Sequence, residues 1–301
     1  MIDLHNHSTK SDGTLTPSEL VIHAMEKGLT AFALTDHDAV DGIDEAIRFA
    51  EDLRSGKEVF PETAANLENS DTPGVPEVIP GIEFSTEWGG RDVHVVGLAI
   101  DHKNESFCGK LKAFIDSRDG RNEKMAKKLA SLGIGITYEG LLQMFPDCVL
   151  TRAHFARYLI EYGYVKNSKE AFERYLGPGC PGYVPREKVT PIQAVEMALE
   201  AGGIPVLAHP MIYSFEPAEL EKLIGEMKEA GLIGIEALYC THTAADERYV
   251  RSLADKFGLA VSGGSDFHGA NKPGLDMGTG YGSLYIPDHV WPELKKAAGK
   301  Q

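Results

Sequence analysis

Hydrophobic and polar residues alternate along the first fifty positions in a way that predicts strands followed by helices. Residues 2–7 and 30–36 are short apolar runs, as expected of buried strands. After the first run, TPSE at 16–19 is a capping box with proline at the first helical position, and its helix is predicted to end near Gly28. A second helix is predicted over residues 41–54. Strand, helix, strand and helix in this order indicate a parallel sheet or barrel.

The pattern changes twice later in the chain. Residues 55–76 are polar and rich in Pro, Asn, Thr and Glu, which predicts an exposed loop, and two strands joined by a hairpin at 87–90 follow it. Helical periodicity with few β-branched runs then dominates, until a second capping box, TPIQ at 190–193, opens another alternation of helices and strands. We therefore predict an α/β barrel made of residues 1–102 and 190–301, interrupted by a small helical insert at 103–189.

The composition is that of a globular chain with an acidic balance. Of 301 residues, 43% are hydrophobic and 25% are charged, and no apolar run reaches the roughly 20 residues of a membrane span. The first residues do not resemble a secretory signal, so we expect a cytoplasmic protein with no membrane partner. The net charge of −15 opposes binding to duplex DNA, and an anionic substrate would need local positive charge. Four cysteines without a CxxC pair argue against disulfides and a thiolate zinc site.

His5 and His7 stand two residues apart on the first predicted strand, so both side chains point to the same face. Two imidazoles on one face can bind a metal ion as a pair. The same spacing is equally consistent with two hydrogen-bonded histidines in an ordinary core, and both interpretations stay open at this point.

Further imidazoles and carboxylates stand at or near the ends of the other predicted strands. Glu83, within the apolar GIEFS stretch, would be a buried carboxylate, and burying it without a partner costs several kcal/mol. Because the carboxyl ends of parallel strands meet at one mouth of a barrel, we expect these groups to converge there. The others are Asp12, His37, His94, His209, Asp266 and His268. Together with the first pair they outnumber the roughly three protein ligands of one catalytic zinc, which predicts two or three metal ions.

The same stretches resemble the signature of a known family. DLHNHSTKSDG, LTDHD, GIEFS, VHVVGL, AHP and GSDFH are similar, in order, to the motifs of the PHP (polymerase and histidinol phosphatase) superfamily of metal-dependent phosphoesterases. The resemblance implies a distorted (β/α)7 TIM-like barrel and, in the most similar branch, an inserted helical cap domain. It also implies how the ligands are shared: His5, His7, Glu83 and Asp266 for a first metal, Glu83, His94 and His209 for a second, and Asp12, His37 and His268 for a third. Asp12 stands where some trinuclear relatives have a histidine.

The resemblance further implies a substrate class and a reaction. Members of the capped branch include phosphatases of 3',5'-nucleotide bisphosphates and an exonuclease that trims RNA from 5' to 3', so small nucleotides or short oligonucleotides are expected. The implied reaction is in-line attack of a metal-bound hydroxide on phosphorus. Ligands without thiolate fit manganese, the ion we expect, or iron or zinc. Similarity to the cap motifs of the family implies that several residues of the insert bind a second phosphate of the substrate. Without that similarity they could be ordinary surface side chains. These candidates are Arg118, Arg121, Arg152 and His154, with His242 near a phosphate or the leaving group.

Three other functions remain open from the sequence. A histidinol-phosphate phosphatase would share the metal ligands without needing the cap. A metal-dependent amidohydrolase would also begin with HxH on a barrel strand, but no bridging lysine stands at a suitable strand end and His268 would have no role. A module that binds metal without turnover would be expected to have lost ligands, whereas every ligand position is filled.

Overall fold

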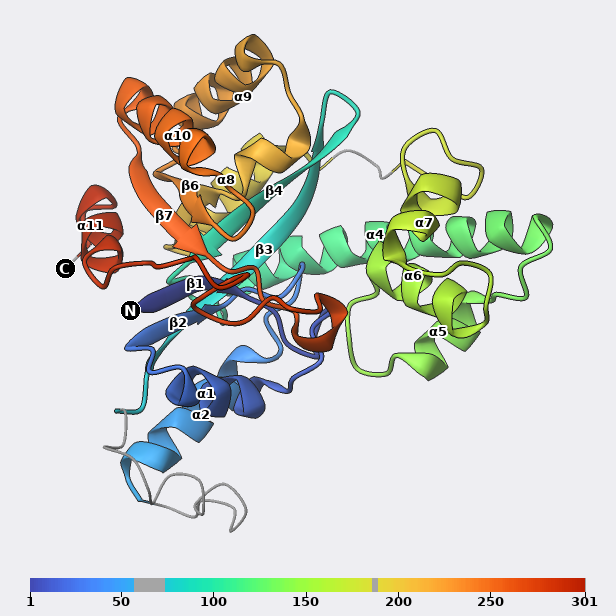
Figure 1. Ribbon diagram of the computed structural model, residues 1–301, viewed down its shortest axis with the longest axis horizontal. Helices are drawn as coiled ribbons and strands as arrows, with labels where there is room; N and C mark the ends of the chain where they lie inside the picture. The colour runs from blue at the N-terminus through green and yellow to red at the C-terminus, as the bar shows by residue number, and fades with distance from the viewer. Residues whose placement is uncertain (57–73, 186–188, 301) are drawn as a thin grey trace.

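The computed structural model describes residues 1–56, 74–185 and 189–300, so most of the loop predicted at 55–76 lies outside the described residues. The described strands form one seven-stranded sheet whose spatial order is the order along the chain (Figure 1). They are β1 (Ile2–Asn6), β2 (Ala31–Leu34), β3 (Glu77–Trp88), β4 (Arg91–Leu98), β5 (Ile204–Leu207), β6 (Gly234–Tyr239) and β7 (Ala260–Gly264).

The sheet curls until its first and last strands meet. The backbone N–H of Asp266 donates to the carbonyl oxygen of His5 over 2.9 Å, and the N–H of His7 donates to that of Phe267 over 2.9 Å. A parallel bridge also joins Asn6 to Phe267. The result is the nearly closed, TIM-like barrel that the sequence predicted, and its closure brings residues from both ends of the chain together.

The strand β4 runs antiparallel to β3, as the hairpin predicted at 87–90 requires. β3 and β4 form a hairpin, and Gly89 and Gly90 in its turn have φ of 59° and 79°, a region that glycine adopts easily. β4 is antiparallel to both β3 and β5, whereas the other adjacent pairs of the described sheet are parallel. We expected His94 near a carboxyl end, but it lies in the first half of β4. It still reaches the mouth because this strand begins there.

Helices cover the outside of the barrel and close one end of it. Apolar faces of the outer helices pack with the strands in one large core. The helix α11 (Val290–Ala297) places Trp291 and Leu294 in a second cluster with β1 and β5, at the end of the barrel far from α5–α7 (Figure 1). The capping boxes predicted at Thr16 and Thr190 are both present. The outer helices are α1 (Pro17–Glu26), α2 (Ile43–Arg54), α8 (Pro191–Glu200), α9 (Pro217–Glu229) and α10 (Ala244–Phe257), with short turns η2 (Pro210–Tyr213) and η3 (Gly269–Asn271).

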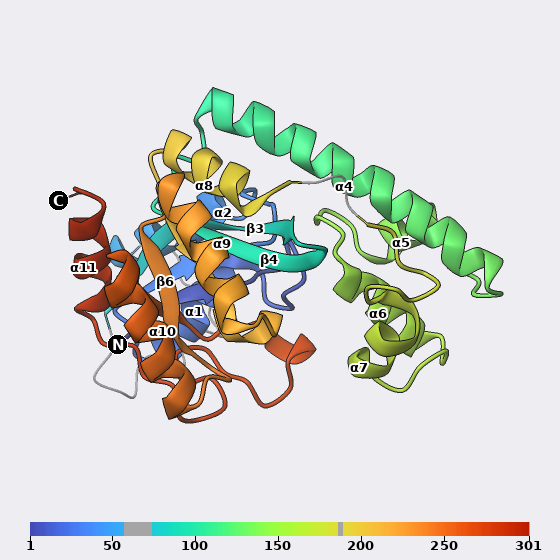
Figure 2. The ribbon, with the colours of Figure 1, turned by 90° about the horizontal axis from the view of Figure 1, so that it is seen from above.

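The segment between β4 and α8 forms a helical unit, defined here as residues 105–176. In Figure 2 the long α4 starts beside α8 and extends beyond the barrel, with α5, α6 and α7 along one side of it. These helices share a hydrophobic cluster of their own, built on residues such as Leu129, Phe155 and Leu176. No helix within the described ranges is long and apolar enough to cross a membrane. The unit consists of α4 (Glu105–Ser131), α5 (Tyr138–Met144), α6 (Arg152–Glu161), α7 (Ser168–Ala171) and the π-helical turn η1 (Phe172–Leu176).

Candidate metal centre

Two histidines at the carboxyl end of β1 face two carboxylates across the barrel mouth. His5 and His7 are fully buried. His5 Nε2 lies 3.3 Å from Glu83 Oε2, and His7 Nε2 lies 3.3 Å from the same oxygen and 3.2 Å from Asp266 Oδ1. The structure therefore brings together the four side chains predicted for a first metal, with one ligand atom of each within 4.8 Å of the others.

Glu83 is the junction of the cluster. Its Oε1 lies 2.8 Å from His94 Nδ1 and 3.0 Å from His209 Nε2, and its Oε2 lies 3.0 Å from His37 Nδ1. The compact group around this carboxylate consists of Glu83, His94 and His37. The resemblance implied His209 in place of His37, and both imidazoles reach Glu83. A second cation can therefore be shared through this carboxylate.

The predicted third set gathers around Asp12 on the loop after β1. Asp12 Oδ1 lies 3.2 Å from His268 Nε2, and its Oδ2 lies 3.8 Å from His37 Nε2. His7 joins the group through its Nδ1, which lies 3.8 Å from Asp12 Oδ1, and its ring stacks on that of His268 with centroids 3.9 Å apart. All the side chains that the sequence singled out as metal ligands thus meet at one mouth.

Several polar atoms in this cluster are buried without a hydrogen-bond partner. A bound cation would supply the missing partner. A buried polar atom left unpaired costs about 1–3 kcal/mol. Imidazole nitrogens and carboxylate oxygens that face one another are donors suited to divalent ions of the first transition row. The residues present therefore fit divalent metal ions. The unpaired atoms of the candidate ligands are His5 Nε2, His7 Nε2, Asp12 Oδ1, Glu83 Oε2 and His209 Nδ1.

The carboxylates and imidazoles of the cluster shift one another's pKa values. Burial lowers the pKa of His7, but Asp266 and Glu83 outweigh it and raise that pKa to about 9. Burial raises the pKa of Glu83, yet His37 and His94 hold it well below its usual range. Because the same imidazole nitrogens would ligate a cation, metal binding must displace protons from them.

Glu236, on β6, is a part of the site that the sequence analysis did not single out. Its Oε1 lies 3.3 Å from His5 Nδ1, and its Oε2 accepts a 2.7 Å hydrogen bond from the backbone N–H of His209. A carboxylate on the far nitrogen of a ligating histidine fixes the tautomer and orientation of the ring. A buried glutamate within the apolar run GIEALY is the same signal that singled out Glu83.

Asp266 also has partners that the sequence did not reveal. Its Oδ2 accepts hydrogen bonds from the Tyr239 hydroxyl at 2.8 Å and from Lys272 Nζ at 2.5 Å. Because both hydrogen bonds involve Oδ2, Oδ1 of Asp266 is free to face His5 and His7. Lys272 lies on the loop after η3, where no periodicity or motif pointed to it.

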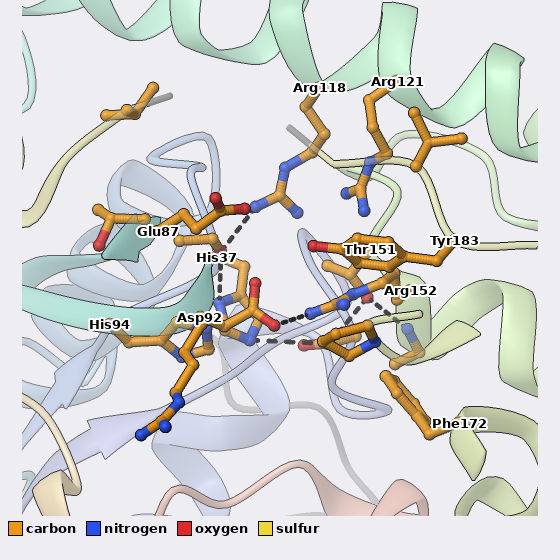
Figure 3. A pocket seen from close by; sticks show the side chains of 18 of the residues that line it. His37, Glu87, Asp92, His94, Arg118, Arg121, Thr151, Arg152, Phe172 and Tyr183 are labelled. Atoms are coloured by element: carbon orange, nitrogen blue, oxygen red, sulfur yellow. Dashed lines mark hydrogen bonds and ion pairs between the residues drawn. The ribbon is translucent and has the colours of Figure 1, made fainter. Parts of the chain in front are cut away.

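A cavity of about 410 Å³ lies between the barrel mouth and the helical unit (Figure 3). Its floor includes Asp12, His37 and His94. Its far wall comes from α4, α6 and η1, and the helical unit contributes Arg121 and Arg152 to it. The cluster of candidate ligands therefore opens into a space bordered by guanidinium groups.

The other predicted substrate-binding residues have different surroundings. Arg118 lines the cavity, but it is buried and its guanidinium pairs with Asp38. His154 turns back on its own helix, where Nδ1 accepts a 2.9 Å hydrogen bond from the backbone N–H of Thr151. His242 lines a separate cavity, with Nδ1 2.9 Å from the carbonyl oxygen of Ala237. The structure thus brings Arg118, Arg121 and Arg152 to the cavity above the cluster and does not bring His154 or His242 there.

A nearly closed α/β barrel whose mouth gathers imidazoles and carboxylates defines a metal-dependent barrel hydrolase. Within that class, residues 3–178 match the family described as the PHP domain. The chain belongs to the PHP domain family.

Relatives in this family resemble the chain over nearly its whole length. The 3',5'-nucleoside bisphosphate phosphatase of Chromobacterium violaceum is 35% identical over 98% of this chain and 96% of its own. A 5'-3' exoribonuclease of Haemophilus influenzae is 38% identical over 88% of this chain and 89% of its own. A solved structure from Chromobacterium violaceum, described as an amidohydrolase with bound sulfate and no metal, is 34% identical with a TM-score of 0.80, and the match covers 98% of this chain and 96% of that one.

Proposed function

We propose that this chain hydrolyses phosphomonoesters of nucleotides that carry a second phosphate. The proposed substrates are 3',5'-nucleoside bisphosphates such as adenosine 3',5'-bisphosphate, which would yield AMP, and the 5' end of short RNA. One observation carries the proposal: the cluster suited to metal ions opens into a cavity whose opposite wall bears Arg121 and Arg152. Such a space has one end for the reacting phosphate and another for a second phosphate.

The metal ligands are proposed as the resemblance implied. His5, His7, Glu83 and Asp266 would hold one ion, Glu83, His94 and His209 a second, and Asp12, His37 and His268 a third. Two or three divalent ions, manganese in our proposal with iron or zinc as alternatives, would supply Lewis-acid activation of water and of phosphate oxygens when bound. Glu236 would hold the His5 ring in place, and Tyr239 and Lys272 would direct Asp266 Oδ1 towards the histidines.

The second phosphate is proposed to bind at the start of α6. Thr151, Arg152 and Ala153 form the first turn of this helix and all line the cavity. The positive end of a helix dipole favours an anion, and a guanidinium adds bidentate hydrogen bonds. We propose that residues 103–189, which contain the helical unit, form a cap domain over the mouth. The ion pair between Arg118 and Asp38 would hold this domain on the barrel.

We propose that the enzyme acts in the cytoplasm and does not bind duplex DNA. Its four cysteines are free thiols, as is usual in a reducing compartment. Its net charge of −15 disfavours a polyanionic duplex, whereas a small nucleotide needs only the local arginines of the cavity.

The proposal is tested by a phosphate-release screen with Mn²⁺ that compares adenosine 3',5'-bisphosphate, AMP, histidinol phosphate and a short 5'-phosphorylated RNA. We expect the bisphosphate to have the highest kcat/KM. Elemental analysis of the same preparation should find more than one equivalent of transition metal, and Asp266→Asn should lose both metal and activity. Activity without metal, or a preference for histidinol phosphate, would contradict the proposal.

The proposed second-phosphate site has its own test. Arg152→Ala should raise KM for the bisphosphate and leave KM for 3'-AMP, which lacks a second phosphate, within twofold. An equal loss on both substrates would count against a second-phosphate site at Arg152.

A further inference from the structure

Arg152 and Asp92 form an ion pair across the cavity, between the helical unit and the hairpin. Arg152 is the first residue of α6, and Asp92 is the second residue of β4. Arg152 donates from its Nη2 to Asp92 Oδ2. The guanidinium proposed to bind a substrate phosphate is therefore already paired with a carboxylate of the protein.

The two partners are held very differently. The side chain of Arg152 is 16% exposed, while that of Asp92 is 42% exposed. The Arg152 guanidinium lies 5.6 Å from the ring centroid of Phe172 and 5.9 Å from that of Tyr183, and Figure 3 shows it between the two rings. Both distances are within the range of cation–π attraction. Arg152 is thus held by its own surroundings, whereas Asp92 can turn towards solvent.

The pair is also correctly placed to exchange with a phosphate of the substrate. Asp92 and His94 are two residues apart on β4, so their side chains share a face and their Cα atoms are about 7 Å apart along the strand. His94 borders the metal cluster through its contact with Glu83. A nucleotide with one phosphate at the cluster and another at the far end of its ribose would bring the second phosphate to the position of the Asp92 carboxylate.

We infer that Asp92 is an exchangeable counter-ion of Arg152, which the second phosphate of the substrate displaces and which thereby sets selectivity for doubly phosphorylated substrates. This inference rests on the proposed function. A phosphate carries close to two negative charges and three acceptor oxygens, so it competes well with a single carboxylate for the guanidinium. A neutral or weakly anionic substrate group at the same position does not displace Asp92, so it obtains no binding free energy from Arg152.

Asp92→Asn tests the inference because it keeps the shape of the side chain and removes its charge. KM for adenosine 3',5'-bisphosphate should fall about three- to tenfold, with kcat within twofold of the wild type. KM for 3'-AMP should change by less than twofold, because this substrate does not compete for Arg152. An unchanged KM for the bisphosphate would overturn the inference, and a raised KM would show that Asp92 instead positions Arg152.

Two further variants distinguish the loss of the Arg152–Asp92 ion pair from the loss of a negative charge anywhere in the cavity. In an Arg152→Met background, Asp92→Asn should no longer lower KM. Glu87→Gln removes another carboxylate that lines the cavity, and it should lower KM by a smaller factor than Asp92→Asn. A drop that persists without Arg152, or an equal drop from Glu87→Gln, would overturn the inference.

Failure of the inference and failure of the proposed function have different signatures in this assay. A wild type that prefers the bisphosphate over 3'-AMP, with an Asp92→Asn variant that behaves identically, overturns the role of Asp92 alone. A wild type without that preference overturns the proposed function itself.

Discussion

Glu83 is the residue on which the metal centre depends most. A fully buried carboxylate is costly unless it is paired, and here three imidazoles lie within 3.0 Å of its two oxygens. Because both oxygens are shared among histidines from β4, from the loop after β2 and from the turn after β5, a small displacement of Glu83 would be felt by every proposed metal site. The side chains that hold the histidines in place should therefore matter as much as the ligands.

Glu236→Gln should weaken metal binding while leaving the fold intact. The change removes the negative charge that fixes His5 Nδ1 and keeps an oxygen for the backbone N–H of His209. Loss of such an outer carboxylate lowers metal affinity about 10- to 100-fold. Chelator competition followed by elemental analysis measures the effect, and Glu221→Gln on the surface of α9 is the matched control. Equal retention of metal by the two variants would contradict the role assigned to Glu236.

His154 gives a pH dependence of stability. Burial lowers the pKa of His154 to about 4, so the folded chain excludes a proton that the unfolded chain binds below about pH 6.5. The contribution of His154 to the stability of the folded state is therefore full above pH 6.5 and falls as the pH drops towards 4, by about 2 kcal/mol between pH 7 and pH 5.

His154→Gln should reduce that loss, because glutamine at this position can still accept the N–H of Thr151 but does not titrate. Urea unfolding of metal-free wild type and variant at pH 7 and pH 5 makes the comparison. If the wild type and the variant lost the same stability between the two pH values, His154 would not be the group responsible.

A buried guanidinium ties the helix α4 to two segments of the barrel. Arg118 reaches from α4 to Asp38, on the loop after β2, and donates a 2.7 Å hydrogen bond to Ser85 of β3. Asp38 has φ of 51°, a conformation that is strained for a residue with a side chain, so its pairing with Arg118 helps to hold this loop in place. The same loop carries His37, a proposed metal ligand. The contact between Arg118 of α4 and Asp38 therefore also affects the position of His37.

Arg118→Met should destabilise the chain by about 3–5 kcal/mol, because it leaves the buried Asp38 carboxylate without its cation. Chemical denaturation monitored by circular dichroism measures the loss. Lys124→Met, an exposed change on the same helix, should cost less than about 0.5 kcal/mol. Similar stabilities for these two variants would show that the buried pair contributes little.

Most elements were predictable because their signals are local. The capping boxes at Thr16 and Thr190 define helix starts within four residues, and the apolar runs define strands. The reversal of β4 followed from the predicted hairpin, but its consequence for His94 was missed. This residue was expected at a carboxyl end, whereas it lies in the first half of a strand that is antiparallel to both β3 and β5.

Across the whole molecule, the arginines of the cavity contrast with the acidic balance of the chain. The chain carries a net charge of −15, yet the cavity over the cluster is bordered by Arg118, Arg121 and Arg152. Each of the first two predicted metal sets draws on strands from both halves of the chain, so bound cations would hold the barrel together.

Mn²⁺ should raise the melting temperature of metal-free enzyme by about 5 °C at saturating concentration, since a ligand at 100 times its Kd stabilises the folded state by about 2.7 kcal/mol. Differential scanning fluorimetry after chelation and dialysis detects the shift, and Mg²⁺ at the same concentration is the comparison ion. Asp266→Asn should show a much smaller shift, and an equal shift in wild type and variant would place the stabilising ion elsewhere.

The residues of the candidate site that stand on sequence motifs could be predicted, and those whose role depends on tertiary contacts could not. The ligand side chains stand on motifs at strand ends, where barrel geometry alone predicts that they converge. The pairing of Asp92 with Arg152 joins distant segments, which no spacing reveals. Lys272 stands on no motif, although it contacts Asp266 only six residues away. His154 was expected at a phosphate, but it completes the capping box at the start of its own helix.

The closure of the barrel between β1 and β7 has a consequence for how the enzyme is made in the cell. His5 and His7 are synthesised about 260 residues before Asp266 and His268, which complete their surroundings. At about 5–20 residues per second, a nascent chain would expose half of its metal centre for many seconds before closure. Metal loading should therefore await the synthesis of these two residues, and nascent chains that lack them should be inactive however much of the helical unit has already folded.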